Sequence, residues 1–243
     1  MLIDADLSQL EYRVAAELSG DMLMRKEIID GLDIHTANAT ELFNDVAMRQ
    51  EAKVLTFRMI YGGSPYAFFM DNNMPNFTLD KWEDIVNSFY KKYNTLKKWQ
   101  DSNYREVCKT GKLVTPTGRT LIFKKKRKSD GSWIYPRPSV CNYPVQSVST
   151  ADIVPLAMVE IERRISLDNL NSKCYIINQV HDSIILDCSN DKKIIDSVCR
   201  ICYTVFNDLP LLIKEWFNLE WETPLTGECK FGNNWSKMEL WCP

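Results

Sequence analysis

Residues 174–188 read CYIINQVHDSIILDC and give the clearest β signal in the chain. Two runs rich in β-branched and aromatic residues, 174–180 and 183–188, are separated only by His181 and Asp182, which predicts a hairpin with a two-residue connection. Asn-Gly or Asp-Gly is the usual pair at such a tip, so His181-Asp182 is an uncommon choice. An acid held between two apolar strands suits a metal-bound carboxylate, although an Asp in a turn is more often only a turn residue.

The N-terminal residues supply a second carboxylate. Residues 1–6 predict a short strand, and Asp4 and Asp6 stand at its end. If Asp6 and Asp182 meet across one sheet, they can hold two divalent ions roughly 3.5–4 Å apart. Spacing along the chain does not by itself bring the two residues together, so the metal site is a hypothesis at this point.

A helix predicted over 47–61 carries a stripe of cationic and aromatic residues. Arg49, Lys53, Phe57 and Tyr61 recur every four residues and therefore share one gently drifting face. Two cations, a ring and a phenol on an exposed face favour a platform for a nucleoside triphosphate. An amphipathic helix with core aromatics and solvated cations explains the same spacing equally well.

Strands and helices are segregated along the chain. Helices are predicted over 8–18, 34–43, 47–61, 79–108, 146–165 and 192–208, with Pro155 kinking the fifth or marking its true start. Residues 115–118 punctuate a hairpin-like stretch that ends in the basic run 124–128, and a last pair of strands is predicted near 219–231. Because the elements do not strictly alternate, the predicted fold class is α+β.

Composition favours a folded protein whose default compartment is the cytoplasm, or an infected cell's cytoplasm if the gene is viral. Hydrophobic residues make up 45% of the 243 residues, which is enough for a core. No apolar run reaches the length of a membrane span, and no signal-peptide pattern is present. Among the eight cysteines, only Cys199 and Cys202 have a C-x-x-C spacing, and they fall in an apolar helical pattern. Reduced, structural cysteines are therefore predicted.

The net charge is only −2, but the cations are concentrated in one segment. Between Lys91 and Arg137, fourteen Lys or Arg residues accompany three acids, a local excess of +11. A basic block of this kind can hold a phosphate backbone. A solvated, lysine-rich surface is an equally good explanation of the segment taken alone.

Six segments of the chain, in order, resemble the motifs of the family A DNA polymerases. They are DADLSQLEYRVAAELSGD (4–21, motif A), DIHTANATELF (33–43), RQEAKVLTFRMIYGG (49–63, motif B), NYPVQSVSTAD (142–152), QVHDSIILD (179–187, motif C) and GECKFGNNW (227–235, the C-terminal strand). One such match is weak, whereas six in family order over nearly the whole chain are strong. The resemblance implies a right-hand polymerase fold, with an antiparallel palm in 1–28 and 141–243, helical fingers in 29–140 and the thumb missing.

The resemblance also implies the reaction and its metals. Asp6 and Asp182 would hold two Mg²⁺ ions, for which Mn²⁺ can substitute, and Lys53 would be the third catalytic residue. A primer 3′-hydroxyl would attack the α-phosphate of a deoxynucleoside triphosphate (dNTP), so that a template directs 5′–3′ DNA synthesis.

Further residues are assigned to the dNTP by resemblance. Arg49, Lys53 and His35 would orient the triphosphate, and Gln9 would contact the nucleotide. Phe57 would stack on the incoming nucleotide, and a phenylalanine at this position should disfavour dideoxynucleotides.

Glu11 falls at the family's steric gate, which presses on the sugar and disfavours ribonucleotides. Tyr61 would pack beside Glu11 and the template base. Ser8 and Glu11 also fit a capping box, but a side chain tied back to Ser8 could not serve as the gate. The position of Tyr61 favours the gate.

Asn142 and Gln146 would contact template and primer near the nascent pair, and Arg13 and His181 are further DNA contacts. Three positions depart from the family pattern. Arg58 replaces a glycine and would add a cation close to the template, Thr56 stands where many relatives have asparagine, and Ser183 replaces a glutamate. These changes leave the two aspartates in place but put fidelity and substrate preference in question.

Motif A begins at residue 4, whereas family members carry a thumb and further palm before it. The chain is therefore expected to be a fragment or split-gene half that works with an N-terminal polymerase portion. Its other expected partners are primer-template DNA and dNTPs.

Three other functions fit parts of the pattern. A single-subunit, phage-type RNA polymerase shares both aspartates, but Glu11 argues against it because an RNA polymerase needs room for the 2′-hydroxyl. A non-catalytic nucleic-acid-binding subunit would be expected to have lost Asp6, Asp182 or Lys53. A two-metal nuclease needs more acids near the pair than the spare Asp4 and Asp187.

Overall fold

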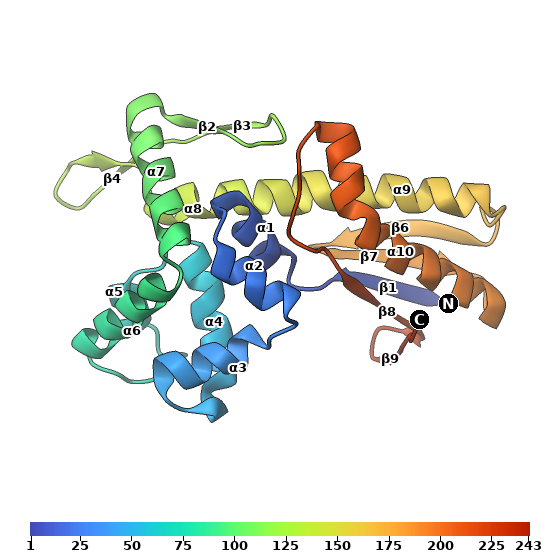
Figure 1. The fold of residues 1–243 in the computed structure, drawn as a ribbon, viewed down its shortest axis with the longest axis horizontal. Coiled ribbons are helices and arrows are strands. Elements are labelled where there is room, and N and C mark those ends of the chain that lie inside the picture. Colours follow the sequence, from blue (N-terminus) through green and yellow to red (C-terminus); the bar gives the residue numbers. More distant parts are fainter. The chain divides into compact units, whose positions relative to one another are not determined.

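The main sheet of the chain is antiparallel and has the strand order β6-β7-β1-β8-β9 (Figure 1). Its strands are β1 (Leu2–Leu7), β6 (Cys174–Val180), β7 (Ser183–Cys188), β8 (Gly227–Asn234) and β9 (Lys237–Leu240). The computed structural model describes residues 1–243, and the sheet belongs to a compact unit formed by Met1–Glu11 and Gln146–Pro243. Two segments from opposite ends of the chain therefore build one sheet.

One face of this sheet is covered by helices α9 (Val154–Leu167) and α10 (Lys192–Phe217). In β1, Ile3, Ala5 and Leu7 are fully buried, whereas the alternate residues Asp4 and Asp6 are only partly buried. Side chains alternate between the two faces of a strand, so the aspartates point away from the apolar layer. The sheet thus presents carboxylates on the face opposite its core.

Helix α10 forms much of this core. It buries an apolar face that includes Cys199 and Cys202, as the spacing of the sequence predicts, and all eight cysteines are free thiols. The helix continues to Phe217, beyond the predicted end at 208, with Pro210 inside it.

The second compact unit, Tyr12–Val145, is mainly helical. It contains α1 (Leu10–Ser19, which begins in the first unit), α2 (Met22–Ile29), α3 (Ile34–Asn38), α4 (Arg49–Ile60), α5 (Pro65–Phe69), α6 (Leu79–Lys92), α7 (Asn94–Thr110) and most of α8 (Arg137–Gln146). A π-helical turn, Ala39–Phe43, follows α3, and a 3₁₀ turn, Val46–Met48, precedes α4. Two small hairpins, β2 (Lys112–Val114) with β3 (Thr120–Ile122) and β4 (Lys126–Arg127) with β5 (Trp133–Ile134), complete the unit.

The α+β prediction is confirmed, but several element boundaries were wrong. The helix predicted over 8–18 begins at Leu10, because Gln9 has a left-handed backbone with φ of 53°. The long helix predicted over 79–108 is two helices, since Tyr93 has non-helical torsions (φ −104°, ψ 60°). Helices α2 and α5 were not predicted.

The later part of the chain also differs in detail. The helix predicted over 146–165 begins earlier, at Arg137, and passes through a π-helical turn, Ser147–Ile153, before α9. Pro155 lies in the first turn of α9, where a missing N–H is harmless, so it marks a start as predicted. The last strands lie at 227–234 and 237–240 rather than near 219–231.

The two units divide at Glu11/Tyr12 and at Val145/Gln146. The predicted palm and fingers boundaries, 28/29 and 140/141, describe functional subdomains rather than contact units and stay a prediction. No helix combines the length and the apolar character that crossing a membrane would require.

Candidate active site

Asp6 and Asp182 lie at the same end of two neighbouring strands. Strand β1 pairs with β7 so that Asp6 is opposite Ser183, the residue after Asp182. The Leu7 N–H donates a hydrogen bond of 3.2 Å to the Asp182 carbonyl oxygen. The sheet therefore brings together the two carboxylates that stand 176 positions apart in the sequence.

The hairpin tip holds Asp182 in an uncommon backbone turn. His181, the first of the two turn residues, has φ of 56°, a left-handed conformation that most non-glycine residues avoid. The side chain of Gln179 connects the tip to a neighbouring segment, because its Nε2 donates hydrogen bonds of 3.2 Å to the carbonyl oxygens of His181 and Thr150. Strained tips of this kind persist where the surroundings fix them, and they cluster at functional sites.

Ionisation of both the Asp6 and the Asp182 carboxylate is disfavoured by their surroundings. Burial raises the pKa of Asp6, and the charges of Asp4 and Glu228 raise it further, whereas a hydrogen bond from Ser183 Oγ to Asp6 Oδ2 (2.7 Å) lowers it. Burial also raises the pKa of Asp182, followed by the charges of Asp6 and Glu11. Two half-buried like charges repel each other, and a cation placed between them would relieve both costs.

The donor set fits magnesium or manganese. Both side chains offer hard carboxylate oxygens, which Mg²⁺ prefers. No group of three or more His, Cys, Asp or Glu side chains is arranged to enclose a metal ion. Mg²⁺ is commonly held by one or two carboxylates together with waters and substrate phosphates rather than by a full protein cage. The Asp6 and Asp182 carboxylates are compatible with that kind of magnesium site.

Three further charged residues lie on the same face of the sheet. Asp4 and Asp6 alternate with buried residues of β1, and Oδ1 of Asp4 is buried with no hydrogen-bond partner. In β8, Lys230 is opposite Asp4 and Glu228 is opposite Asp6, and the two β8 side chains form an ion pair of 2.6 Å. The sequence analysis missed Glu228 and Lys230. The alternation within GECKFGNNW, which puts both on one face, was the available signal.

Gly227 allows β8 to approach Asp6 closely. A Cβ added there would lie 2.3 Å from the Phe206 ring and 2.4 Å from the Asp6 carbonyl oxygen. No side chain fits in this space, so the glycine holds β8 against the strand that carries the carboxylate.

In the second unit, α3 and α4 are joined by an ion pair that the sequence analysis also missed. Asp33 caps α3 by accepting from the backbone N–H groups of His35 and Thr36. It also accepts from Arg49 Nε at 2.8 Å and from a terminal nitrogen of Arg49 at 3.3 Å. This bidentate pair holds the pKa of Asp33 well below its usual range.

His35 is buried and uncharged at neutral pH. Burial lowers its pKa to about 4, and the positive charge of Arg49 acts in the same direction. Its Nδ1 has no hydrogen-bond partner, and its ring lies 5.9 Å from that of Phe57. The protein therefore leaves the hydrogen-bonding capacity of this buried nitrogen unused.

Helix α4 turns its predicted stripe away from the core. Its buried residues are Ala52, Leu55, Thr56, Met59 and Ile60. Arg49 and Lys53 are exposed, Phe57 is half-buried, and Tyr61 caps the C-terminal end of the helix. The stripe is therefore neither a core face nor uniformly solvated.

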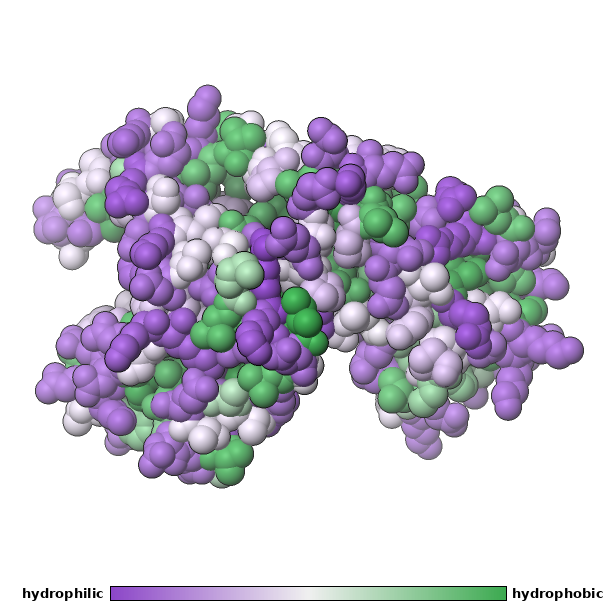
Figure 2. All heavy atoms as spheres, in the orientation of Figure 1, coloured by the Kyte–Doolittle hydropathy of each residue, from purple (hydrophilic) through white to green (hydrophobic).

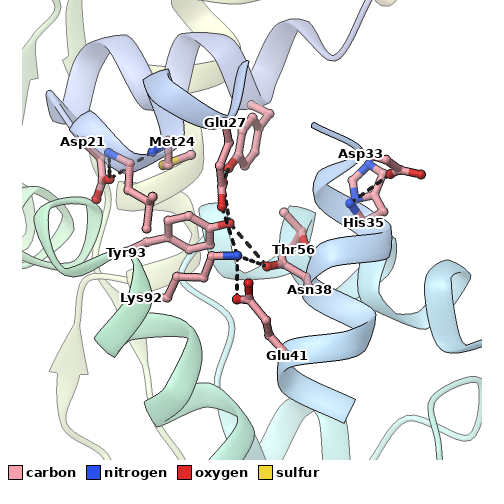
Figure 3. A network of polar contacts seen from close by, with 12 residues as sticks. Asp21, Met24, Glu27, Asp33, His35, Asn38, Glu41, Thr56, Lys92 and Tyr93 are labelled. Atoms are coloured by element: carbon pink, nitrogen blue, oxygen red, sulfur yellow. Dashed lines mark hydrogen bonds and ion pairs between the residues drawn. The ribbon is translucent and has the colours of Figure 1, made fainter. Parts of the chain in front are cut away.

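A buried polar network links α3 and α4 to helices α1, α2 and α6 (Figure 3). Glu27 of α2 accepts hydrogen bonds from the hydroxyls of Tyr12 (2.9 Å) and Tyr93 (2.8 Å) and pairs with Lys92 of α6 (3.0 Å). Lys92 also donates to Asn38 Oδ1 at 3.0 Å, and Asn38 Nδ2 donates to Thr56 Oγ1 at 3.0 Å. Thr56, which differs from the family's asparagine, thus connects α4 to this network.

Arg58 is engaged within its own unit. It forms an ion pair with Asp71 and lies 5.7 Å above the Phe68 ring. The expectation of an extra cation close to the template stays a prediction, and the Asp71 carboxylate partly offsets the charge of Arg58.

The remaining predicted residues are divided between the units. The unit that contains Asp6 and Asp182 also contains Gln9, Glu11, Gln146 and His181. The negative charge of Glu11 helps to raise the pKa of Asp182. Arg13 and Asn142 belong to the helical unit with His35 and α4; burial lowers the pKa of Arg13, and Asn142 has a buried Oδ1 without a partner. The predicted packing of Tyr61 beside Glu11 joins residues of different units and stays a prediction.

The chain is similar in sequence to bacterial DNA polymerase I proteins. DNA polymerase I of Caldicellulosiruptor bescii is 29% identical over 242 residues, which cover 97% of this chain and 26% of that protein. The thermostable DNA polymerase I of Thermus aquaticus is 26% identical over 249 residues, covering 97% of this chain and 27% of that protein. This chain thus spans about a quarter of the length of the curated relatives it matches.

The solved POL domain of Pol1 from M. smegmatis, in complex with DNA primer-template and dNTP, has the same fold. Its TM-score is 0.77 at 20% identity, over 96% of this chain and 40% of that one. The model of DNA polymerase family A matches residues 1–237. Because that match covers nearly the whole sequence, the chain belongs to DNA polymerase family A.

Proposed function

We propose that this chain carries the nucleotidyl-transfer site of a template-directed DNA polymerase, which adds deoxynucleotides to a primer 3′-hydroxyl. The observation that carries the proposal is Asp6 at the end of β1 beside Asp182 in the hairpin turn before β7, in a chain matched by the family A model over residues 1–237. The DNA polymerase I relatives and the POL domain bound to primer-template and dNTP support the same reaction.

Asp6 and Asp182 would hold two Mg²⁺ or Mn²⁺ ions. When bound, these ions would increase the acidity of the primer hydroxyl and neutralise charge on the phosphates. Ser183 would position the Asp6 carboxylate, because its hydroxyl donates a hydrogen bond of 2.7 Å to Asp6 Oδ2. Burial and mutual repulsion keep both carboxylates poorly compensated until cations arrive.

The helical unit would bind the triphosphate. Lys53 and Arg49 supply positive charge on the exposed side of α4, and Arg49 is held in place by Asp33. His35 is neutral at pH 7, so its role is that of a hydrogen-bonding group rather than of a cation. Phe57 would stack on the incoming nucleotide.

The other assignments follow the family motifs. Gln9 and Tyr61 would contact the nucleotide, and Glu11 would exclude the ribose 2′-hydroxyl. The DNA contacts would be Arg13, Asn142, Gln146 and His181.

The proposal includes a further polymerase portion, because the relatives are about four times as long as this chain. That portion, in the same polypeptide or a separate subunit, would complete the grip on primer-template DNA. The expected setting is the cytoplasm of a bacterium or of a phage-infected cell.

Single-nucleotide primer extension by the purified chain with Mg²⁺ tests the proposal. Asp182→Asn keeps the size of the side chain and removes its charge, and it should abolish extension. Asp187→Asn is the matched control, because Asp187 is exposed near the far end of β7 and its side chain pairs with the N-terminal amine at 3.5 Å. It should extend the primer as the unchanged chain does.

Mn²⁺ binding measured by calorimetry separates two causes of inactivity. If the chain does not extend a primer but loses Mn²⁺ binding on Asp182→Asn, the metal site is correct and the missing portion is required. Extension that survives Asp182→Asn, or Mn²⁺ binding that both variants lose equally, would refute the assignment.

A further inference from the structure

The small hairpin β4–β5 carries the most concentrated positive charge of the chain. The run Lys124–Lys128 contains five consecutive cations, and all five residues are exposed. The hairpin extends away from α7 in Figure 1, and the surface over it is mainly hydrophilic in Figure 2. Both strands belong to the helical unit, so this feature is independent of the sheet that carries Asp6.

One face of the hairpin combines cations with aromatic rings. Arg127 of β4 is directly opposite Trp133 of β5, and directly opposed residues point to the same face. Trp133 is 61% exposed, an unusual position for an indole. Just outside these two-residue strands, Lys125 Nζ lies 5.4 Å from the centre of the Tyr135 ring, which is half-buried. The hairpin therefore presents an exposed indole opposite a guanidinium, and a second cation lies over the neighbouring tyrosine ring.

The hairpin is fixed at both ends. At its base, the Tyr104 hydroxyl donates to the Tyr135 carbonyl oxygen at 3.1 Å, and Tyr135 packs on the small core of Val107, Phe123 and Val140. At its tip, Asp130 accepts hydrogen bonds from the N–H (2.9 Å) and the hydroxyl (2.6 Å) of Ser132. Hydrogen bonds thus order the hairpin on both sides of Trp133, while its own ring is exposed.

We propose that this face binds a single-stranded nucleic-acid segment, with phosphates on Lys125 and Arg127 and a base stacked on Trp133. An exposed ring flanked by cations is the usual platform for unpaired bases, because every base offers a flat π face once it leaves the duplex. A solvated lysine surface accounts for the charge but not for an indole held open opposite a guanidinium.

The identity of the strand rests on the proposed function, since a templated polymerase presents unpaired template. The binding itself needs neither metal nor nucleotide. It can therefore be tested separately from nucleotidyl transfer.

The test measures fluorescence anisotropy of a labelled oligothymidylate of about 12 nucleotides, titrated with the chain over a NaCl series without Mg²⁺ or dNTP. Trp133→Ala should weaken binding about fivefold or more, as stacking on one ring predicts. Trp133→Phe keeps a ring and should retain most of the affinity. Lys125→Gln with Arg127→Gln should reduce the salt slope by about 1.4, the value for two phosphate contacts on a single strand.

Lys192→Gln with Lys193→Gln is the matched control, because it removes two exposed cations from the start of α10 in the other unit. This control should leave affinity within twofold, and Asp182→Asn should bind as the unchanged chain does even if it cannot extend a primer. Trp133→Ala should reduce the affinity of the chain for a blunt duplex less than its affinity for the oligothymidylate.

The proposal is overturned if the unchanged chain does not bind the oligothymidylate, if Trp133→Ala binds within twofold of it, or if the control weakens binding as much as the hairpin variants. Equal losses for single strand and duplex would also overturn it, because they would show a surface that recognises phosphates alone. Melting temperatures of all variants detect a purely structural effect, which Trp133→Ala would show as a lower Tm without a ring-dependent change in affinity.

Discussion

Two glutamates contact the same lysine in the helical unit, and they should differ strongly in their effect on stability. Lys92 Nζ lies 3.0 Å from Glu27 and 2.7 Å from Glu41. The side chain of Glu27 is only 7% exposed, whereas that of Glu41 is 53% exposed. Distance alone would rank Glu41 first, but burial reverses the order because water screens the exposed pair.

Glu27→Ala removes the buried acceptor that three donors share, and of these only Tyr93 and Lys92 have another partner. The Tyr12 and Tyr93 hydroxyls lose hydrogen bonds of 2.9 and 2.8 Å, and Lys92, itself 12% exposed, loses its buried partner. Breaking a buried, hydrogen-bonded pair costs about 3–5 kcal/mol. At about 2–4 °C per kcal/mol for a chain of this size, the melting temperature should fall by about 6–20 °C.

Glu41→Ala is the control within the same network. It removes the shorter of the two ion pairs but leaves Lys92 bound to Glu27 and Asn38. The expected cost is about 1 kcal/mol or less, a shift below about 4 °C. Thermal denaturation followed by circular dichroism, with urea unfolding for the free energy, measures both.

Equal costs for the two alanine variants, or a cost of Glu27→Ala below about 1 kcal/mol, would refute the reasoning from burial. A double change, Glu27→Leu with Lys92→Met, should recover part of the loss, because a buried ion pair replaced by apolar side chains leaves no unpaired charge. Recovery should stay incomplete, since the Tyr12 hydroxyl still lacks its acceptor and the Tyr93 hydroxyl keeps only the 3.3 Å hydrogen bond to Asn38 Oδ1.

Three other perturbations have defined outcomes. Gly227→Ala places a methyl group 2.4 Å from the Asp6 carbonyl oxygen, so it should cost about 1–3 kcal/mol, and an unchanged melting temperature would contradict the close approach. The folded pKa of His35, about 4, lies below the ordinary 6.5, so the unfolded chain binds more protons between these values and stability falls as pH is lowered through them. From pH 7 to pH 5 the unchanged chain should therefore lose about 2 kcal/mol more than His35→Gln in urea unfolding, and equal losses would show that His35 is not held neutral by the fold. Arg58→Gln breaks the ion pair with Asp71 and should lower the free energy of unfolding by about 1 kcal/mol, with the DNA affinity measured by anisotropy unchanged. Weaker DNA binding at constant stability would instead support a contact between Arg58 and the template.

Local sequence signals predicted the elements that carry the proposed chemistry. The β-prone runs around His181 and Asp182 form β6 and β7. The residues that recur every four positions from Arg49 lie on α4, with Tyr61 at its C-cap, as expected. The pairing of β1 with β7 could not be derived from spacing, since nothing in either segment encodes a partner so far along the chain. It was available only through resemblance to the family.

The missed features depend on contacts between distant segments. The break at Tyr93 divides two runs that both have good helical periodicity, so no local signal separates them. Glu27 meets Tyr93 across 66 positions, and Asp33 meets Arg49 across 16. Such partners become visible only once the helices are packed, because each charge alone is typical of a solvated surface.

Ser183 shows how one departure from the family pattern changes the balance of charge at the site. The family's glutamate at this position would stand directly opposite Asp6, because β1 and β7 pair these two residues. A third carboxylate there would add repulsion to a carboxylate whose pKa burial already raises. Serine donates a hydrogen bond to Asp6 instead, which stabilises the ionised form before any cation binds. The exchange lowers the electrostatic cost of the folded site and removes one negative charge that would attract cations, so the proposed cation binding would rest on Asp6 and Asp182.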